Sequence, residues 1–361
     1  MQILIYSLFL FYSISFVTKR GQILNNIYVQ RFFLSSFILL SLFISIASGI
    51  DYIDRSVYTS QFFTATQDSF GNFLEKHNDS LMFYIITFLI TKITSNPEVY
   101  YVFMHLLFLY FLIRGLYLIF NKNLYVTVLA FFIFLNFTIY YSYTLNILRQ
   151  GLAFVIIIYS IGCILNYKQK RFYLILFTAP FVHWTSLFFT LLVIVSRKIK
   201  TYNTFTLIII YTIFSTLYLT HTSDIFTNQL SFILPTNSEG YLSLNRIEQY
   251  GGSYKVQFWF FNTIFFILLM SPLIFKKLFA LNKLKNYDVF FYYYTITSSV
   301  FFLFGFIPFA DRIAGYSWLL IPILLAQFIN SIKISNYLKF LLLIIMLIVG
   351  FISTPLNGRF F

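Results

Sequence analysis

Long apolar stretches recur from one end of this 361-residue chain to the other, and they are the feature that most limits its fold. A stretch of about 18 or more apolar residues, at about 1.5 Å per residue, is long enough to cross the roughly 30 Å hydrocarbon core of a bilayer as an α-helix. Charged residues make up only 10% of the chain, whereas roughly a quarter of the residues in a soluble domain are charged. We therefore predict an all-α, polytopic integral membrane protein.

The apolar stretches predict about 10 to 12 transmembrane helices, some of them re-entrant or half-helix segments. The sequence shows no linker and no soluble domain, so we expect one integral membrane domain over residues 1–361, with long loops at 51–80 and 222–255. The clearest predicted spans are 1–18, 31–50, 98–120, 124–143, 148–166, 203–221, 256–275, 288–308, 313–331 and 336–353.

Basic residues in short loops predict which ends of the spans face the cytoplasm. The clusters KQKR at 168–171 and RKIK at 197–200 flank a single apolar stretch, and both should be cytoplasmic. Since one span cannot return to the side that it left, we predict a membrane hairpin over 172–195, broken near Pro180 and with its tip at His183. Non-helical backbone inside the membrane is tolerated where it lines a cavity or is buried in protein. The topology therefore predicts a cavity at His183.

The apolar stretch at 80–94 reaches only ~22 Å if it is helical. If it crossed the membrane, every later basic loop would lie outside, so we interpret it as a re-entrant or interfacial helix on the outer side. The acidic or mixed loops at 51–80 and 222–255 then lie outside as well. This topology places Arg149 at the outer mouth of its helix.

Polar residues from five separated parts of the sequence meet at the outer face in this topology. Asn146, Arg149 and Gln150 follow the helical spacing i, i+3 and i+4, and such a row of donors suits a phosphate group. Ordinary interpretations stand beside this one, because an arginine at a helix end can snorkel to the headgroups and loop charges are usually solvated. The candidate site residues are Asp51, Asp54, Asn146, Arg149, Gln150, His183, Ser186, Arg246, Asp311, Arg312 and Tyr316.

The net charge of +14 comes from 25 Lys and Arg residues against 11 Asp and Glu residues. The basic residues lie in short clusters between apolar stretches, so we assign them to topology and to contact with anionic membrane lipids, and not to nucleic acid. The sequence has no Gly-rich phosphate loop, no Cys/His metal spacing, and neither HExxH nor GxSxG. We therefore expect no metal and no cofactor.

Four segments together resemble a known family. They are SGIDYIDRSVY at 48–58, NILRQGLAFVIIIYS at 146–160, FVHWTSLFF at 181–189 and DRIAGY at 311–316. Their order and spacing resemble the EpsG-like branch of the Wzy polysaccharide polymerases. The resemblance implies a metal-independent enzyme of the bacterial inner membrane, similar in fold to GT-C glycosyltransferases, that joins repeat units of O-antigen, capsule or exopolysaccharide on the periplasmic face. The implied partners are an undecaprenyl-diphosphate-linked glycan donor and acceptor, with a chain-length regulator as a further candidate.

Guanidinium groups are the candidates for stabilising the departing diphosphate in such a reaction. Arg149 is the first choice, with Arg246 and Arg312 as helpers, because fixed positive charge can stabilise the leaving group where no metal does. The segment at 48–58 departs from the common family pattern, since Arg55 follows its second aspartate and no arginine precedes its first.

A base must take the proton of the acceptor hydroxyl. His183 is the first candidate by residue type, and Asp54 and Asp311 are the alternatives. Two other functions remain open at this point. A lipid-linked oligosaccharide flippase would handle the same diphosphate with cationic residues inside a central cavity, and a membrane acyltransferase that modifies the glycan would use His183 as its base.

Overall fold

The computed structural model describes residues 2–15, 17, 23–47, 53–77, 80–167, 169, 171–196, 203–222, 254–305 and 310–353. Every regular element within these ranges is a helix, which confirms the all-α prediction. The chain divides into two compact units, which are Met1–Leu191 with Leu325–Phe361 (unit 1) and Leu192–Leu324 (unit 2). The prediction of one membrane domain stays a prediction.

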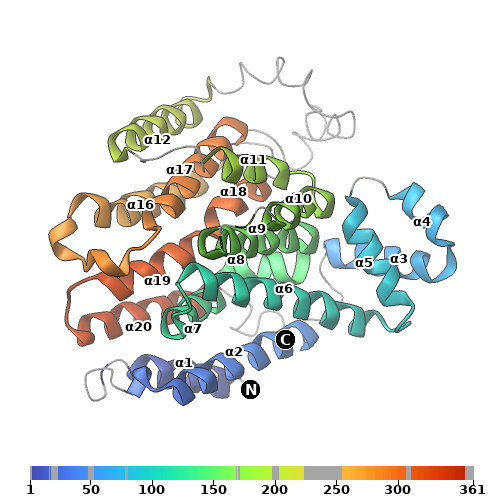
Figure 1. The fold of residues 1–361 in the computed structure, drawn as a ribbon, viewed down its shortest axis with the longest axis horizontal. Coiled ribbons are helices and arrows are strands. Elements are labelled where there is room, and N and C mark those ends of the chain that lie inside the picture. The colour runs from blue at the N-terminus through green and yellow to red at the C-terminus, as the bar shows by residue number, and fades with distance from the viewer. Residues whose placement is uncertain are drawn as a thin grey trace. The chain divides into compact units, whose positions relative to one another are not determined.

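Unit 1 holds most of the helices (Figure 1). They are α1 (Gln2–Ile14), α2 (Ile27–Ala47), α3 (Ile53–Gln67), α4 (Phe70–Lys76), α5 (Leu81–Thr91), α6 (Pro97–Ile119), α7 (Leu124–Leu135), α8 (Thr138–Tyr141), the π-helical turn η3 (Ser142–Asn146), α9 (Leu148–Tyr167), α10 (Arg171–Val182) and α20 (Asn336–Ser353). Unit 2 holds α12 (Thr204–Leu219), α16 (Val256–Ile274), the 3-10 turns η6 (Lys276–Leu278) and η7 (Leu281–Lys283), α17 (Tyr287–Phe304) and α18 (Ala310–Trp318). Both α11 (Ser186–Ser196) and α19 (Ile321–Ser331) begin in one unit and end in the other.

Five helical segments of the described chain are long and apolar enough to cross a membrane. They are Ile27–Ala47, Pro97–Ile119, Leu148–Tyr167, Val256–Ile274 and Ala310–Ser331. A sixth forms if α7 is joined to Thr138–Asn146, and this pair is bent by 82°. Helix length and hydropathy therefore confirm a multi-pass membrane protein. Six shorter apolar helices of 10–17 residues accompany these spans, and which of them enter the bilayer stays a prediction.

α9 lies at the centre of unit 1, packed against α6 on one side and α10 on another (Figure 1). Most of its residues are buried. The crossing with α6 is close because glycine faces glycine, and a Cβ added to Gly162 would lie 2.9 Å from the carbonyl oxygen of Gly115. Small residues at such a crossing let two helix backbones approach each other. The sequence around Arg149 is thus attached to a rigid central helix.

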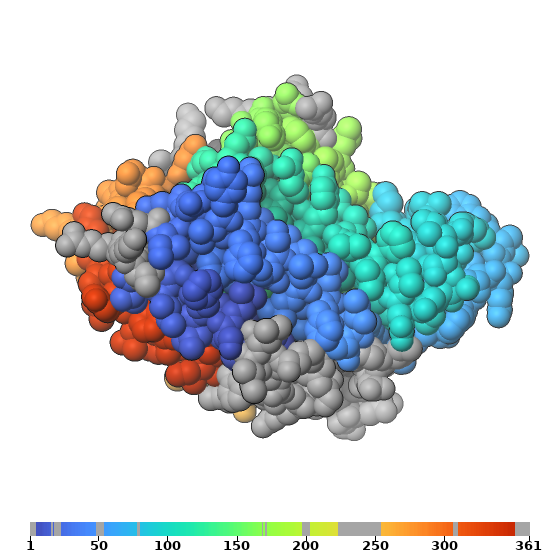
Figure 2. All heavy atoms as spheres, turned by 90° about the horizontal axis from the view of Figure 1, so that it is seen from below, coloured from blue at the N-terminus to red at the C-terminus, as the bar shows by residue number. Residues whose placement is uncertain are grey.

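Aromatic side chains join the first two helices to α7. The rings of Phe9 and Tyr12 meet those of Phe33, Phe37 and Phe132, with centroids 4.9 to 5.6 Å apart in edge-to-face or tilted arrangements. Such pairs are favoured over flat face-to-face stacking because the ring edge is positive and the ring face is negative. Figure 2 shows α1 and α2 (blue) packed side by side on the face seen from below.

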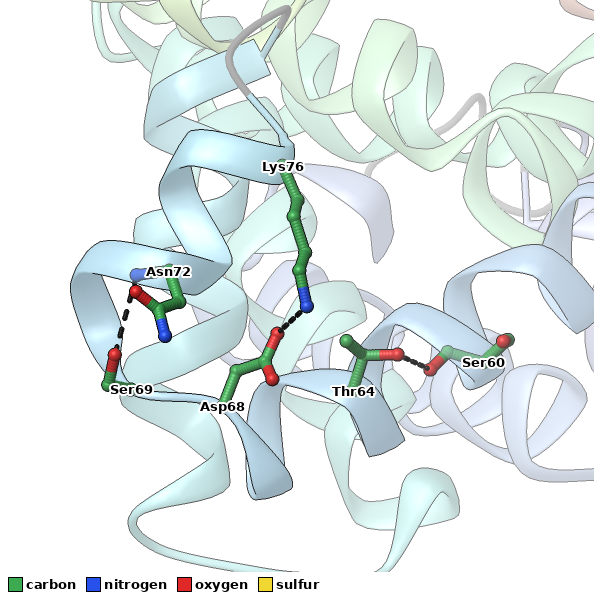
Figure 3. Close-up of polar contacts among 6 residues, drawn as sticks. All are labelled: Ser60, Thr64, Asp68, Ser69, Asn72 and Lys76. Carbon is green, nitrogen blue, oxygen red and sulfur yellow. Dashed lines mark hydrogen bonds and ion pairs between the residues drawn. The ribbon is translucent and has the colours of Figure 1, made fainter.

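The predicted outer loop at 51–80 is largely helical. It contains α3 and α4, joined by a tight corner at which Ser69 caps α4 by accepting a hydrogen bond from the N–H of Asn72 (Figure 3). Lys76 pairs with Asp68 across this corner at 2.8 Å. The lysine side chain is 58% exposed, so this ion pair contributes little to stability. The side of the membrane on which the corner lies stays a prediction.

The apolar stretch at 172–195 forms nearly all of α10 and α11. We expected Pro180 to break the helix, and this placement is wrong, because Pro180 lies inside the last turn of α10 and the helix ends at Val182. The backbone N–H of His183 still bonds to the carbonyl oxygen of Ala179, at 3.0 Å, so the turn closes around the proline. The break falls at 183–185 instead, and the membrane hairpin stays a prediction.

The stretch at 80–94 contains α5, a helix of 11 residues. At about 1.5 Å per residue it is much shorter than a bilayer core. α5 packs against α3, α4, α6 and α10 within unit 1, so its N-terminal turn faces other parts of the same unit. Its re-entrant or interfacial placement stays a prediction.

Candidate anion-binding site

Arg149 is held by three side chains from two other helices. Its Nη1 donates a hydrogen bond to Oγ of Ser80 at 3.1 Å and a longer one to the hydroxyl of Tyr84 at 3.4 Å. Its Cζ lies 5.9 Å from the ring centroids of both Tyr58 and Tyr84, within range of a cation–π attraction. The three partners are buried and Arg149 itself is half-buried. We call Arg149, Tyr58, Ser80 and Tyr84 the Arg149 site.

The start of α9 fixes where Arg149 lies. α9 begins at Leu148, after Ile147 has left helical geometry with φ −88° and ψ 57°. Because the N–H groups in the first turn of a helix have no acceptor within the helix, they carry partial positive charge. The side chain of Ile147 has no acceptor to offer them. Arg149 therefore adds a full positive charge to a helix end that already favours anions.

A π-helical turn runs directly into α9. In η3 the N–H of Ile147 bonds to the carbonyl oxygen of Ser142, at 2.8 Å, which is the i to i−5 pattern of a π-helix. The turn packs so closely on α9 that a Cβ added to Gly151 would lie 2.2 Å from the carbonyl oxygen of Tyr143. Only glycine fits there without a backbone shift, so Gly151 of the LRQG sequence sets the position of Arg149 in space.

The helical row expected at Asn146, Arg149 and Gln150 is interrupted. Asn146 ends η3 and Arg149 lies in α9, so the spacing i, i+3 and i+4 does not place all three on one helix face, and this part of the prediction is wrong. Oδ1 of Asn146 instead accepts a hydrogen bond from the backbone N–H of Asp54, at 3.0 Å. Asn146 thus caps the first turn of α3 from outside. Gln150 is buried, with 1% of its surface exposed.

His183 occupies the break between α10 and α11. Its Nδ1 lies 2.7 Å from Oγ1 of Thr185 and 3.3 Å from the backbone nitrogen of the same residue. A backbone N–H can only donate, so Nδ1 accepts, and the neutral ring carries its proton on Nε2. Ser186 begins α11 and is fully buried, and its Oγ has no hydrogen-bond partner in the described structure.

The remaining predicted site residues fall in two groups. Asp311, Arg312 and Tyr316 lie on α18 in unit 2, where the first two are half-buried and Tyr316 is buried. Their approach to Arg149 stays a prediction. Asp51 and Arg246 lie outside the described residues, as do residues 223–253 of the predicted loop at 222–255.

The described residues contain no group of three or more His, Cys, Asp or Glu side chains that could hold a metal ion. Cys163, the single cysteine of the sequence, is buried in α9. The groups that contact the guanidinium of Arg149 are the hydroxyls of Ser80 and Tyr84 and the rings of Tyr58 and Tyr84. Such a set suits an oxyanion held by Arg149 and by hydrogen-bond donors.

Comparison with known protein families identifies the family of this chain. The model of the EpsG family matches residues 30–358. The chain belongs to the EpsG family. This family is linked to exopolysaccharide biosynthesis. No curated protein and no solved structure matches the chain, so the likeness of its fold to GT-C enzymes stays a prediction.

Several contacts of this EpsG-family site were missed from the sequence. Ser80 is the N-cap of α5 and Tyr84 lies in its first turn, at 69 and 65 positions from Arg149, and nothing local in the sequence links such distant segments. Their spacing of i and i+4 at the start of a short apolar helix is the one signal that could have found them, because it sets two hydroxyls on one face. Tyr58 has no such signal, because the sequence predicts a loop over 51–80.

Proposed function

We propose that this EpsG-family chain is a polysaccharide polymerase, a metal-independent glycosyltransferase of the bacterial inner membrane. Its substrates would be undecaprenyl-diphosphate-linked oligosaccharide repeat units, used as donor and acceptor at the periplasmic face. The product would be O-antigen, capsule or exopolysaccharide. Family membership supports polysaccharide biosynthesis, and the observation that carries the proposal is the guanidinium of Arg149 held at the start of α9.

The held guanidinium suits a diphosphate leaving group. A fixed cation stabilises developing negative charge without having to reorganise during the reaction. Ser80 and Tyr84 fix one end of the guanidinium by hydrogen bonds to Nη1. The first turn of α9 adds backbone dipoles of the same sign. The two effects act together where the lipid diphosphate would dock.

The proposed reaction is a substitution at the anomeric carbon of the growing chain. A hydroxyl oxygen of the incoming repeat unit forms a bond to that carbon, while the bond from the carbon to the diphosphate oxygen breaks. The electron pair of the broken bond leaves with undecaprenyl diphosphate, and the hydroxyl proton passes to a base. Negative charge grows on the departing diphosphate, and stabilising it in the transition state raises the rate.

We assign the base to Asp54 ahead of His183 and Asp311. Asp54 lies in the first turn of α3, and its backbone is bonded to Asn146, three residues before Arg149. A base must offer a lone pair, and Nδ1 of His183 already accepts from Thr185. In its neutral form His183 would donate from Nε2, which suits a hydrogen bond to a diphosphate or sugar oxygen.

Replacing Asp54 by asparagine should remove the base and leave the fold intact. The contact to Asn146 uses the backbone N–H of Asp54, so the substitution retains it. General base catalysis typically contributes about 10²- to 10⁴-fold, and we expect long polymer to disappear at normal protein level. Glycan length profiles of Asp54→Asn, His183→Gln and Asp311→Asn compare the three candidates. Asp68→Asn, which changes a surface ion pair, is the control, and unchanged polymer in Asp54→Asn would refute the assignment.

Deletion of the gene tests the proposed function against its alternatives. A strain without a polymerase should accumulate single lipid-linked repeat units on the outer leaflet, where a membrane-impermeant glycan-modifying reagent can reach them. Single units retained on the inner leaflet would instead indicate a flippase. Polymer of normal length that lacks an acyl group would indicate an acyltransferase. Either of these two outcomes contradicts the polymerase.

A further inference from the structure

We propose that Arg55 is a positioning residue for the Arg149 site. It locks the N-terminal part of α3 against α2 and α6, and α3 in turn carries Tyr58 and Asp54 to Arg149 and Asn146. This inference rests on the proposed function, because it states how the diphosphate-binding arginine is kept in place.

Arg55 is buried at a junction of three helices. Only 3% of its surface is exposed. Its Nη2 donates to the carbonyl oxygen of Ser45 in the last turns of α2, at 3.2 Å. Its Cζ lies 4.0 Å from the centroid of the Tyr101 ring in α6, a cation–π geometry that is strengthened when water is excluded. One side chain of α3 is therefore attached to both α2 and α6.

The backbone of Arg55 joins the same junction. The hydroxyl of Tyr101 donates to the carbonyl oxygen of Arg55 at 2.5 Å, and Oγ1 of Thr59 donates to this oxygen at 3.0 Å. The two hydroxyls lie 2.7 Å apart. Tyr101 thus contacts Arg55 twice, with its ring under the guanidinium and its hydroxyl on the carbonyl group. This double contact fixes both the position and the rotation of α3.

The residues on either side of Arg55 belong to the site. The preceding residue, Asp54, binds Oδ1 of Asn146 through its backbone N–H. Tyr58 follows Arg55 by three positions, on the next turn of α3, and its ring lies 5.9 Å from Cζ of Arg149. A shift or rotation of α3 would move both contacts. The contacts of Arg55 to Ser45 and Tyr101 hold α3, so we take its influence on Arg149 to pass through α3.

The chemistry of the side chain explains why arginine is used. Burying a charge is costly, and an apolar side chain of similar volume would pack three helices together at least as well. A guanidinium adds what an apolar chain lacks, namely a flat cation that stacks on an aromatic ring and donates in a fixed direction. Lysine retains the charge and loses this geometry, which makes it the informative replacement.

Arg55→Lys should lower the turnover number more than it lowers the amount of folded protein. Purified protein in nanodiscs would be supplied with undecaprenyl-diphosphate-linked repeat units, with rates expressed per folded molecule and kcat and KM measured separately. A displaced transition-state group lowers kcat and kcat/KM together, and we expect a loss of about 10- to 100-fold in each, since a small misplacement is enough for that. Tyr101→Phe removes the hydroxyl contact and retains the ring, so we expect a smaller loss in the same direction. Arg114→Lys, at an exposed arginine of α6, is the control.

A double variant separates positioning from a merely structural role. If Arg55 acts through Arg149, then Arg55→Lys should cost less rate in an Arg149→Ala protein than in the wild type, because only the displacement of Asp54 still matters there. Equal losses in both backgrounds, or a wild-type kcat in Arg55→Lys, would overturn the inference. Tyr101→Phe supplies the same comparison if Arg55→Lys does not fold.

Binding of undecaprenyl diphosphate, measured as protection against thermal unfolding, separates this inference from the proposed function. If wild-type protein binds this lipid but forms no polymer, the polymerase is refuted. The role of Arg55 can then still be tested, because Arg55→Lys should bind undecaprenyl diphosphate more weakly than the wild type. Wild-type protein that neither polymerises nor binds the lipid would overturn both. If Arg55→Lys binds the lipid as tightly as the wild type, or polymerises at the same rate, the role of Arg55 is overturned and the proposed function stands.

Discussion

Replacing Arg149 with alanine is expected to abolish long polymer while the protein remains in the membrane. The substitution removes the guanidinium that we assign to the departing diphosphate, along with its hydrogen bonds to Ser80 and Tyr84. Removing one donor that stabilises a developing anion typically costs about 3 to 4 kcal/mol, a factor of hundreds in rate. The measurement is the glycan ladder of cells that carry the variant, read beside the membrane level of the protein.

Arg114 provides the matched control for this variant. It is an arginine of another helix in unit 1, and it is exposed. An arginine that only snorkels to lipid headgroups should be replaceable without loss of polymer. We expect Arg114→Ala to give a wild-type ladder. If Arg149→Ala also gave a wild-type ladder at a normal protein level, Arg149 would be an ordinary anchor and the site would lie elsewhere.

The second large effect is expected at Gly151. Alanine there would place its Cβ 2.2 Å from the carbonyl oxygen of Tyr143, so η3 or α9 would have to move. Overpacking of this kind typically costs 1 to 3 kcal/mol and occasionally more, and we expect about 3 kcal/mol because the clash is with backbone. Thermal unfolding of the purified protein should show a lowered Tm. Polymer should be lost as well, because Arg149 lies two residues away.

Gly71 offers a comparison with the same chemical change. It lies inside α4, and a Cβ added to it would meet no atom within 4 Å. Alanine is favoured over glycine in a helix by about 1 kcal/mol, so Gly71→Ala should leave the Tm unchanged or raise it. A Gly151→Ala protein with wild-type Tm and polymer would show that the close packing of η3 on α9 is not needed.

Length and apolar character predict the longest helices, although they miss α3 and α4 in the predicted loop at 51–80. The predicted spans 98–120 and 148–166 correspond to α6 and α9 with ends that differ by one residue. In lipid, a helix makes all of its backbone hydrogen bonds internally, and its side chains must be apolar over the whole span, so a long apolar stretch in the sequence indicates it. The residue at which a helix ends inside such a stretch is harder to predict. Pro180 is an example, because it lies in the last turn of α10 and the helix continues to Val182.

The candidate site was predicted only in part. Arg149 could be found because a charge next to a long apolar helix is rare and therefore informative. Its partners Ser80 and Tyr84 could not, since their contact depends on how α5 packs against the rest of unit 1. The sequence places Arg55 in a predicted loop because the segment around it has no long apolar run, and its burial is a tertiary effect.

Asn146 shows a third kind of limit. Its spacing from Arg149 suggested one continuous helix face, and a π-helical turn redirects it toward α3. A π-helical turn has no sequence signature comparable to a helix cap, and it recurs at functional sites. Asn146 therefore acts on α3 and through it on the site.

Reconstitution of the purified protein with undecaprenyl-diphosphate-linked repeat units, and with no other protein, tests the central claim most directly. The account predicts a ladder of polymer in which each new linkage is matched by one released undecaprenyl diphosphate. It also predicts that Arg149→Ala at equal amount gives no ladder within the same time. Wild-type protein that binds the lipid-linked units and returns them unjoined, or an Arg149→Ala protein that matches the wild-type rate, would contradict it.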